Sequence, residues 1–127
     1  RVVRAGAATT VSLASAVREI LCNDEIAAVA AFTVTGTTAL MLAKSRLTCP
    51  ILALSPSLQT VRRMGMYYGV EAARAPTPEH TRDVLSIASH YALQKGIAER
   101  GQKIIVLSGR PIGTPGSTNT LVVHTVE

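Results

Sequence analysis

The chain has 127 residues, of which 47% are hydrophobic and 3% aromatic, and its formal net charge is +5. This length is that of one domain (residues 1–127), and the composition indicates a core of Ala, Val, Leu and Ile rather than a disulfide-stapled or aromatic-rich fold. No apolar run approaches the ~20 residues that cross a bilayer, and the first eight residues lack the apolar segment of a signal peptide. We therefore expect a soluble, cytoplasmic protein without a membrane partner.

The basic residues and the two cysteines restrict the classes of ligand. The Lys and Arg residues are scattered, no cluster of them is interleaved with aromatic residues, and no DNA- or RNA-binding motif is present, so we expect no nucleic-acid partner. A small anionic ligand suits the positive charge better. Cys22 and Cys49 lack metal-ligand spacing and lie beside apolar residues, so we expect two buried, reduced thiols and no metal site.

The first half of the chain predicts alternating helices and strands. Apolar residues at helical spacing indicate a helix over 10–22, and a strand over 27–32 follows it. A turn of Thr residues around one glycine then leads into a second helix that ends near residue 45. The short apolar run 51–54 is typical of a strand buried on both faces of a parallel sheet. Ser55 and Pro56 are predicted to cap and begin the next helix, from which Arg62 and Arg63 point outward.

The second half continues the pattern and ends on a strand. Residues 70–75 form a weak strand candidate near the sheet edge, and a helix is predicted from Thr77 to a cap at Gly96. The apolar run 104–107 predicts another strand. A loop over 108–120 then leads to a last strand over 121–126, which is expected to run antiparallel because the loop is too short for a helical crossover.

Two segments are candidate binding elements because both follow the carboxyl ends of predicted parallel strands, where ligands bind in open α/β sheets. The first is the turn after residue 32, where a glycine allows a tight bend, a neighbouring Thr is expected to cap the next helix, and backbone N–H groups and hydroxyls face an anion such as a phosphate. An ordinary capped helix start is the alternative. The turn residues are Thr33, Thr35, Gly36, Thr37 and Thr38.

The second candidate element is the loop over 108–120, which is rich in Gly and Pro and long enough to suggest a binding role. If its strand neighbours the first one, the two segments face each other around a shared anion pocket. Arg110 would then supply positive charge, and glycine backbone would close over a sugar phosphate. The loop's site candidates are Arg110, Gly113, Thr114 and Gly116.

The order of these motifs resembles the C-terminal domain of pyruvate kinase over nearly the whole chain. The Ser/Thr–Gly–Thr turn and the Gly–x–Thr–Asn–Thr ending are its most specific parts. The segments that carry the resemblance are Phe32–Ala39, Lys44–Ile51, Gln59–Arg62, Tyr67–Val70, Gly101–Gly109 and Gly116–Thr120.

The resemblance implies a three-layer α/β/α sandwich whose mostly parallel sheet has about five strands, the last of them antiparallel. It implies a regulatory domain that binds an effector, often fructose 1,6-bisphosphate, and that forms a subunit contact in a homo-oligomer, a tetramer in the parent enzyme. The Thr33–Thr38 turn would hold one effector phosphate, and Gly116 with its neighbours would form the flap over the sugar.

The resemblance also places catalysis outside these 127 residues. The magnesium and potassium ligands and the catalytic lysine of pyruvate kinase belong to a β/α barrel, so the partner of this domain would be that catalytic domain. The chain alone is expected to be inactive and to hold no cofactor. His80, His90 and His124 have no partners at ligand spacing, and no paired carboxylates, nucleophile elbow or Walker lysine is present.

Two departures from the family pattern leave alternatives open. Some effector-responsive members carry a basic residue within the phosphate turn, where this chain has Val34 and Thr37, and the chain has no Trp to help hold a second phosphate. Arg110 is the candidate for the missing charge. The effector is otherwise a monophosphate, or the site is vestigial and the domain only assembles subunits. A stand-alone hydrolase or transferase of phosphorylated molecules is a third hypothesis, for which no catalytic residues are found.

Overall fold

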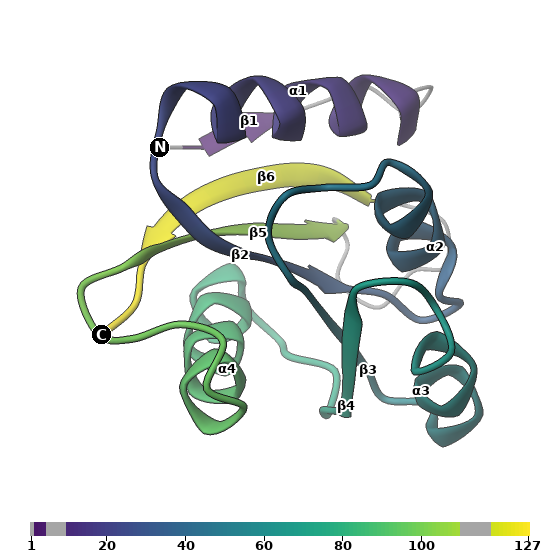
Figure 1. The fold of residues 1–127 in the computed structure, drawn as a ribbon. Helices are drawn as coiled ribbons and strands as arrows, with labels where there is room; N and C mark the ends of the chain where they lie inside the picture. The colour runs from purple at the N-terminus through teal and green to yellow at the C-terminus, as the bar shows by residue number, and fades with distance from the viewer. Residues whose placement is uncertain (1, 5–9, 110–117) are drawn as a thin grey trace.

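The computed structural model describes residues 2–4, 10–109 and 118–127, which form a six-stranded sheet with helices on both faces (Figure 1). The spatial order of the strands is β1-β6-β5-β2-β3-β4. The pairs β5–β2, β2–β3 and β3–β4 are parallel, whereas β6 is antiparallel to β5. The elements are β1 (Val2–Arg4), α1 (Thr10–Asn23), β2 (Ile26–Phe32), α2 (Thr37–Lys44), β3 (Ile51–Ser55), α3 (Leu58–Met64), β4 (Val70–Arg74), α4 (Thr81–Gln94), β5 (Lys103–Gly109) and β6 (Thr118–Thr125). The predicted α/β fold with an antiparallel last strand is confirmed.

The two faces of the sheet pack against different helices because successive side chains of a strand point to opposite sides. Ala30 and Phe32 of β2 lie in a cluster with Val84 and Ala88 of α4. The alternate residues of β2 pack against α1 and α2 on the other face, where α3 also lies (Figure 1). The central strands are therefore apolar on both faces, as the uninterrupted runs of Ala, Val, Ile and Leu predict.

One strand, β1, was not predicted from the sequence. It has three residues, and it pairs antiparallel with β6 through Val2↔Val122, Val3↔Leu121 and Arg4↔Thr120. A run this short carries no periodicity of its own, so only its pairing with the distant C-terminal strand defines it. The strand β6 also begins earlier than predicted, at Thr118, and takes three residues from the predicted loop. The sheet thus has one strand more than the expected five.

Two predicted helix starts are displaced along the chain. The cap of α3 is Ser57, whose side chain accepts a hydrogen bond from the Thr60 N–H at 3.3 Å, because Ser55 is still the last residue of β3. The helix α4 begins at Thr81 rather than Thr77. Sheet hydrogen bonding continues past β4, because the Ala75 N–H donates to the Ser55 carbonyl at 2.9 Å. The chain then crosses to the other face of the sheet before α4 begins.

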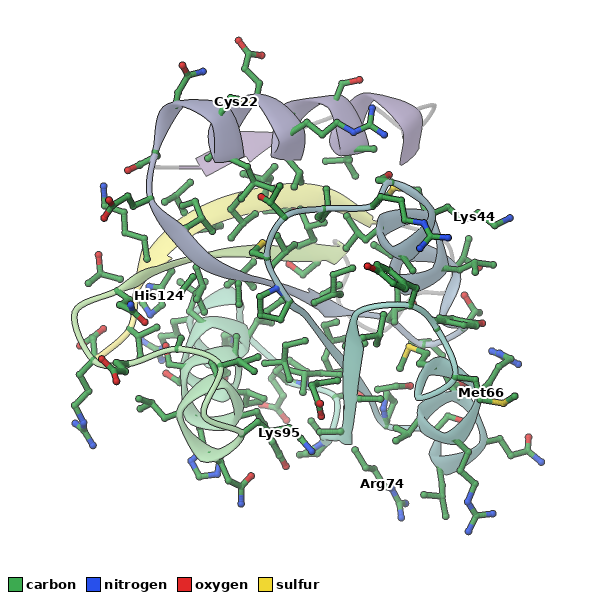
Figure 2. The ribbon with its side chains drawn as sticks, viewed as in Figure 1. Cys22, Lys44, Met66, Arg74, Lys95 and His124 are labelled. Atoms are coloured by element: carbon green, nitrogen blue, oxygen red, sulfur yellow. The ribbon has the colours of Figure 1, made fainter. Side chains whose placement is uncertain are left out.

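The two cysteines are both free, but the expectation that both are buried is wrong for Cys22. It lies near the end of α1, which covers the same face of the sheet as α2, and its side chain is exposed (Figure 2). Cys49 is half-buried before β3, and this burial raises the pKa of its thiol, although backbone hydrogen bonds oppose the rise. None of the helices in the described ranges is long and apolar enough to cross a membrane.

Candidate functional site

The candidate site lies at the carboxyl ends of β2 and β5. Between these two strands the order of the sheet switches from one side of β2 to the other. After β2 the chain adds β3 and β4 on one side, and it then returns through α4 to place β5 on the other side of β2. The pair Ala31↔Leu107 sets the ends of these two parallel strands side by side. Ligands of open α/β sheets bind at such a switch point, outside the carboxyl ends of the strands.

The turn that follows β2 is held by its own hydroxyl groups. The buried Thr33 donates its N–H to the Leu54 carbonyl at 2.8 Å, and its Oγ1 accepts a hydrogen bond from the Gly36 N–H at 3.0 Å. The Oγ1 atoms of Thr35 and Thr37 lie 3.1 Å apart, and both of these residues are exposed. The turn therefore buries Thr33 as a structural support, and the predicted site residue Thr38 is buried as well. It presents two hydroxyls, those of Thr35 and Thr37, which donate or accept hydrogen bonds, to solvent.

The N-cap residue of α2 is Gly36 and not a threonine, although the neighbouring Thr35 hydroxyl accepts a hydrogen bond from the first helical N–H, that of Thr37, at 3.5 Å. Gly36 has φ of 88°, and this N-cap residue itself makes no side-chain hydrogen bond. This left-handed conformation is one that residues with a Cβ rarely adopt. The Gly36 N–H is used inside the turn by Thr33, so it is not one of the groups that face a ligand. The carbonyl of Gly36 accepts the first helical hydrogen bond, from the Leu40 N–H at 3.0 Å.

The neighbouring helix α3 also holds the turn, through residues that were not identified from the sequence. Thr60 donates its hydroxyl hydrogen to the Val34 carbonyl at 3.0 Å, and Arg63 donates from Nη2 to the Thr35 carbonyl. Two successive carbonyls of the turn are thus bonded to side chains of one helix. Arg63 is exposed, as expected, but its guanidinium group lies against the turn instead of pointing away from the protein.

Positive charge also borders the turn on its other side. A cavity of about 410 Å³ opens between α1 and α2, and Thr37 is part of its lining. Arg18 and Lys44 line the same cavity, and none of its described lining residues is acidic. Figure 2 shows the Lys44 side chain extending from α2 toward solvent. Together with Arg63, these two residues place positive charges on the elements around the turn.

Only part of the second predicted binding element is described. Ser108 and Gly109 end β5 beside the turn, and they pair with Thr120 and Thr118 at the start of β6. Both Ser108 and Thr120 are buried, so they support the sheet rather than face a ligand. The remaining predicted site residues lie outside the described residues; these are Arg110, Gly113, Thr114 and Gly116.

The three histidines lie away from this site. His80 precedes α4, His90 is on α4, where its ring packs edge-on against that of Tyr91, and His124 is on β6 with Nε2 4.0 Å from a Glu127 carboxylate oxygen. Among residues 2–4, 10–109 and 118–127, no group of three or more His, Cys, Asp and Glu side chains is arranged to hold a metal ion.

Comparison with known proteins gives consistent relatives. Residues 11–124 match the family model "Pyruvate kinase, alpha/beta domain". A pyruvate kinase of Agrobacterium vitis is 38% identical over 112 residues, which is 88% of this chain and 24% of that protein. One from Geobacillus stearothermophilus is 31% identical over 118 residues, or 93% of this chain and 20% of that protein. The chain therefore spans about a quarter or less of the length of these relatives.

A solved structure supports the fold. The structure of Cryptosporidium parvum pyruvate kinase in complex with ADP superposes with a TM-score of 0.76 at 22% sequence identity. The superposition covers 95% of this chain and 23% of the other. Nearly all of this chain thus has a counterpart of the same fold within a larger protein.

Proposed function

The chain belongs to the pyruvate kinase alpha/beta domain family, and from this membership we propose that it binds a phosphorylated effector at the turn between β2 and α2. The effector class is a sugar phosphate such as fructose 1,6-bisphosphate. Differential affinity of this ligand for two quaternary states would shift the activity of the parent enzyme. The domain is regulatory, and the chemistry belongs to another part of the protein.

The observation that carries the proposal is the arrangement of charge and hydroxyls at the switch point. The exposed hydroxyls of Thr35 and Thr37 stand at the start of α2, where the helix dipole favours negative charge. The guanidinium group of Arg63 is bonded to the same turn. A phosphate monoester carries up to two negative charges and several acceptor oxygens, so it matches both features.

The parent enzyme is proposed to be a pyruvate kinase that transfers a phosphoryl group from phosphoenolpyruvate to ADP. Its catalytic barrel, with the magnesium and potassium ligands, would be the partner of this domain within the protein. The relatives are four to five times longer than their matched parts, which leaves room for such a barrel. No described residue of this chain is assigned to that chemistry.

Calorimetric titration of this chain tests the effector proposal. We expect fructose 1,6-bisphosphate to bind with a dissociation constant below about 1 mM, and fructose, which lacks phosphate, to give no binding heat, because the site recognises charge. Thr37→Val keeps the branched shape but removes one exposed hydroxyl, so it should weaken binding about fivefold, the loss of one hydrogen bond worth about 1 kcal/mol.

The control for this titration is Thr48→Val, which removes an exposed hydroxyl near the amino ends of β2 and β5, opposite the strand ends that carry the turn, and should leave the affinity unchanged. Glucose 6-phosphate and AMP serve as additional probes of phosphate recognition. Absence of binding by all three phosphorylated compounds at millimolar concentration would contradict the effector role for this domain.

A second proposed role is subunit assembly, which one surface favours. A groove of about 590 Å³ runs between α1 and β6. Its lining combines the apolar residues Ala16, Ile20, Leu121 and Val123 with the polar or charged residues Glu19, Asn23, Asp24, Lys103 and Thr125. Within the described residues, β1 pairs with β6 only from Thr120 to Val122, so the end of β6 has no strand beside it on that side. An open strand edge with apolar neighbours is suited to contact a second copy.

Sedimentation velocity of the chain tests the assembly role. We expect a dimer at tens of micromolar concentration, and we expect Val123→Lys, which places a charge in the groove, to shift the population to monomer by at least tenfold in dissociation constant. Leu58→Lys is the control, because Leu58 is exposed on α3 and does not line the groove. A wild-type chain that stays monomeric at all concentrations would exclude this contact as an independent interface.

A further inference from the structure

We infer that Arg63 is the fixed cation of the effector site and that it supplies the positive charge that Val34 and Thr37 do not. The inference rests on the proposed effector function and adds to it a residue that determines affinity for the phosphate. It is carried by the contacts that α3 makes with the turn rather than by the turn itself.

The position of Arg63 is set by its hydrogen bond and by packing. Its Nη2 donates to the Thr35 carbonyl, and the same atom lies 3.4 Å from the place where a Cβ on Gly36 would be. The positive charge is therefore in contact with the backbone of Thr35, which carries one of the two exposed hydroxyls, and beside Gly36, which precedes the other. Arg63 lies in the last turn of α3 next to the buried Met64, so the helix fixes the position of the Arg63 backbone.

The chemistry of the guanidinium group allows it to hold the turn and a ligand at the same time. Arginine has five N–H donors in a planar fork, and the bond to Thr35 uses one of them. The remaining donors are of the kind that binds phosphate oxygens in pairs. A lysine would place one strongly hydrated ammonium there and could not reproduce the fork.

Two other residues of α3, Thr60 and Arg62, allow the effect of charge to be distinguished from the effect of structural support. Thr60 bonds to the Val34 carbonyl and so supports the same turn, but it is neutral. Arg62 is exposed and carries the same charge on the same helix, but no hydrogen bond joins it to the turn within the described part of the chain. These two residues are matched controls, one for support without charge and one for charge without contact.

The test is calorimetric titration of fructose 1,6-bisphosphate into the wild-type chain and three variants at several salt concentrations. We expect Arg63→Gln to weaken binding about tenfold and to reduce the salt dependence of the affinity, because a direct charge contact is lost. Arg62→Gln should change the affinity less than about twofold, since an exposed charge farther away is screened. Thr60→Val should cause a smaller loss and leave the salt dependence as in the wild type.

Each other outcome counts against the inference in a distinct way. Equal affinity of Arg63→Gln and the wild type would remove Arg63 from the site while leaving the effector function intact. Equal losses in Arg63→Gln and Thr60→Val with the same salt dependence would show that Arg63 only supports the turn. If the wild type does not bind, the effector function fails first. Hydrogen exchange of the Gly36 amide then tests the hydrogen bond from Arg63 to the Thr35 carbonyl without a ligand. Exchange should be faster in Arg63→Gln than in the wild type, and equal exchange would contradict the described role of this bond.

Discussion

Replacing Leu107 with alanine is expected to lower the free energy of unfolding by about 3–4 kcal/mol, the range for a buried leucine that leaves a cavity. Leu107 is fully buried near the end of β5. It packs with Leu13 and Val17 of α1 and Leu42 of α2, so it joins two helices to the strand that lies beside the turn. These neighbours belong to different elements and are unable to close the cavity together.

Urea unfolding followed by circular dichroism measures this effect. The midpoint should fall while the slope of free energy against urea stays constant, which indicates lost stability without a change in the surface exposed on unfolding. The control is Leu58→Ala on α3, where the leucine is 44% exposed, and it should cost less than about 1 kcal/mol. A loss below about 1 kcal/mol for Leu107→Ala would contradict the packing described for this face of the sheet.

Gly36→Ala is expected to destabilise the chain by about 2–3 kcal/mol and to weaken effector binding at least tenfold. The left-handed backbone at φ of 88° costs a residue with a Cβ about 1–2 kcal/mol. The new methyl group would also stand 3.3 Å from Met64 Cγ, which is buried, and 3.4 Å from Arg63 Nη2. Relief of these contacts requires a shift of a few tenths of an ångström, and because Met64 is buried we expect the turn and its hydroxyls to make that shift.

Gly101→Ala is the matched control for Gly36→Ala. Gly101 has φ of 90°, but no atom lies within 4 Å of a Cβ placed on it. This variant should therefore show only the backbone cost, about 1–2 kcal/mol, and unchanged effector affinity. Unfolding and calorimetry of the two variants together separate conformation from contact. Equal effects of both variants on stability and binding would mean that the approach of α3 to the turn has no role.

The sequence predicts well those parts of the fold that are encoded by neighbouring residues. The helix over 10–22 follows from the spacing of Leu13 and Val17, and the strands follow from uninterrupted apolar runs. The left-handed cap at Gly96, with φ of 71°, follows from a glycine just after a helical stretch. The alternation of strands and helices also predicts that the turn after β2 and the end of β5 lie at the same, carboxyl-terminal ends of the parallel strands.

The parts that were missed depend on residues far apart in the chain. The strand β1 exists through its pairing with β6, and the helix α4 starts late because the chain first crosses from one face of the sheet to the other. Arg62 and Arg63 are the same residue type in adjacent positions. Only the packing of α3 beside the turn decides that Arg63, and not Arg62, contacts it. Local patterns contain no information about that choice.

The central position of β2 has a consequence for how the chain folds. The contacts from β2 through β3 to β4 join segments that are close in sequence, whereas the pair Val29↔Ile105 closes a loop of roughly 75 residues, a large entropic cost. We expect the β2–β3–β4 unit to form early and β5 to dock last. The turn and Arg63 of α3 both belong to this early unit, so an anion that binds there would speed refolding more than it slows unfolding.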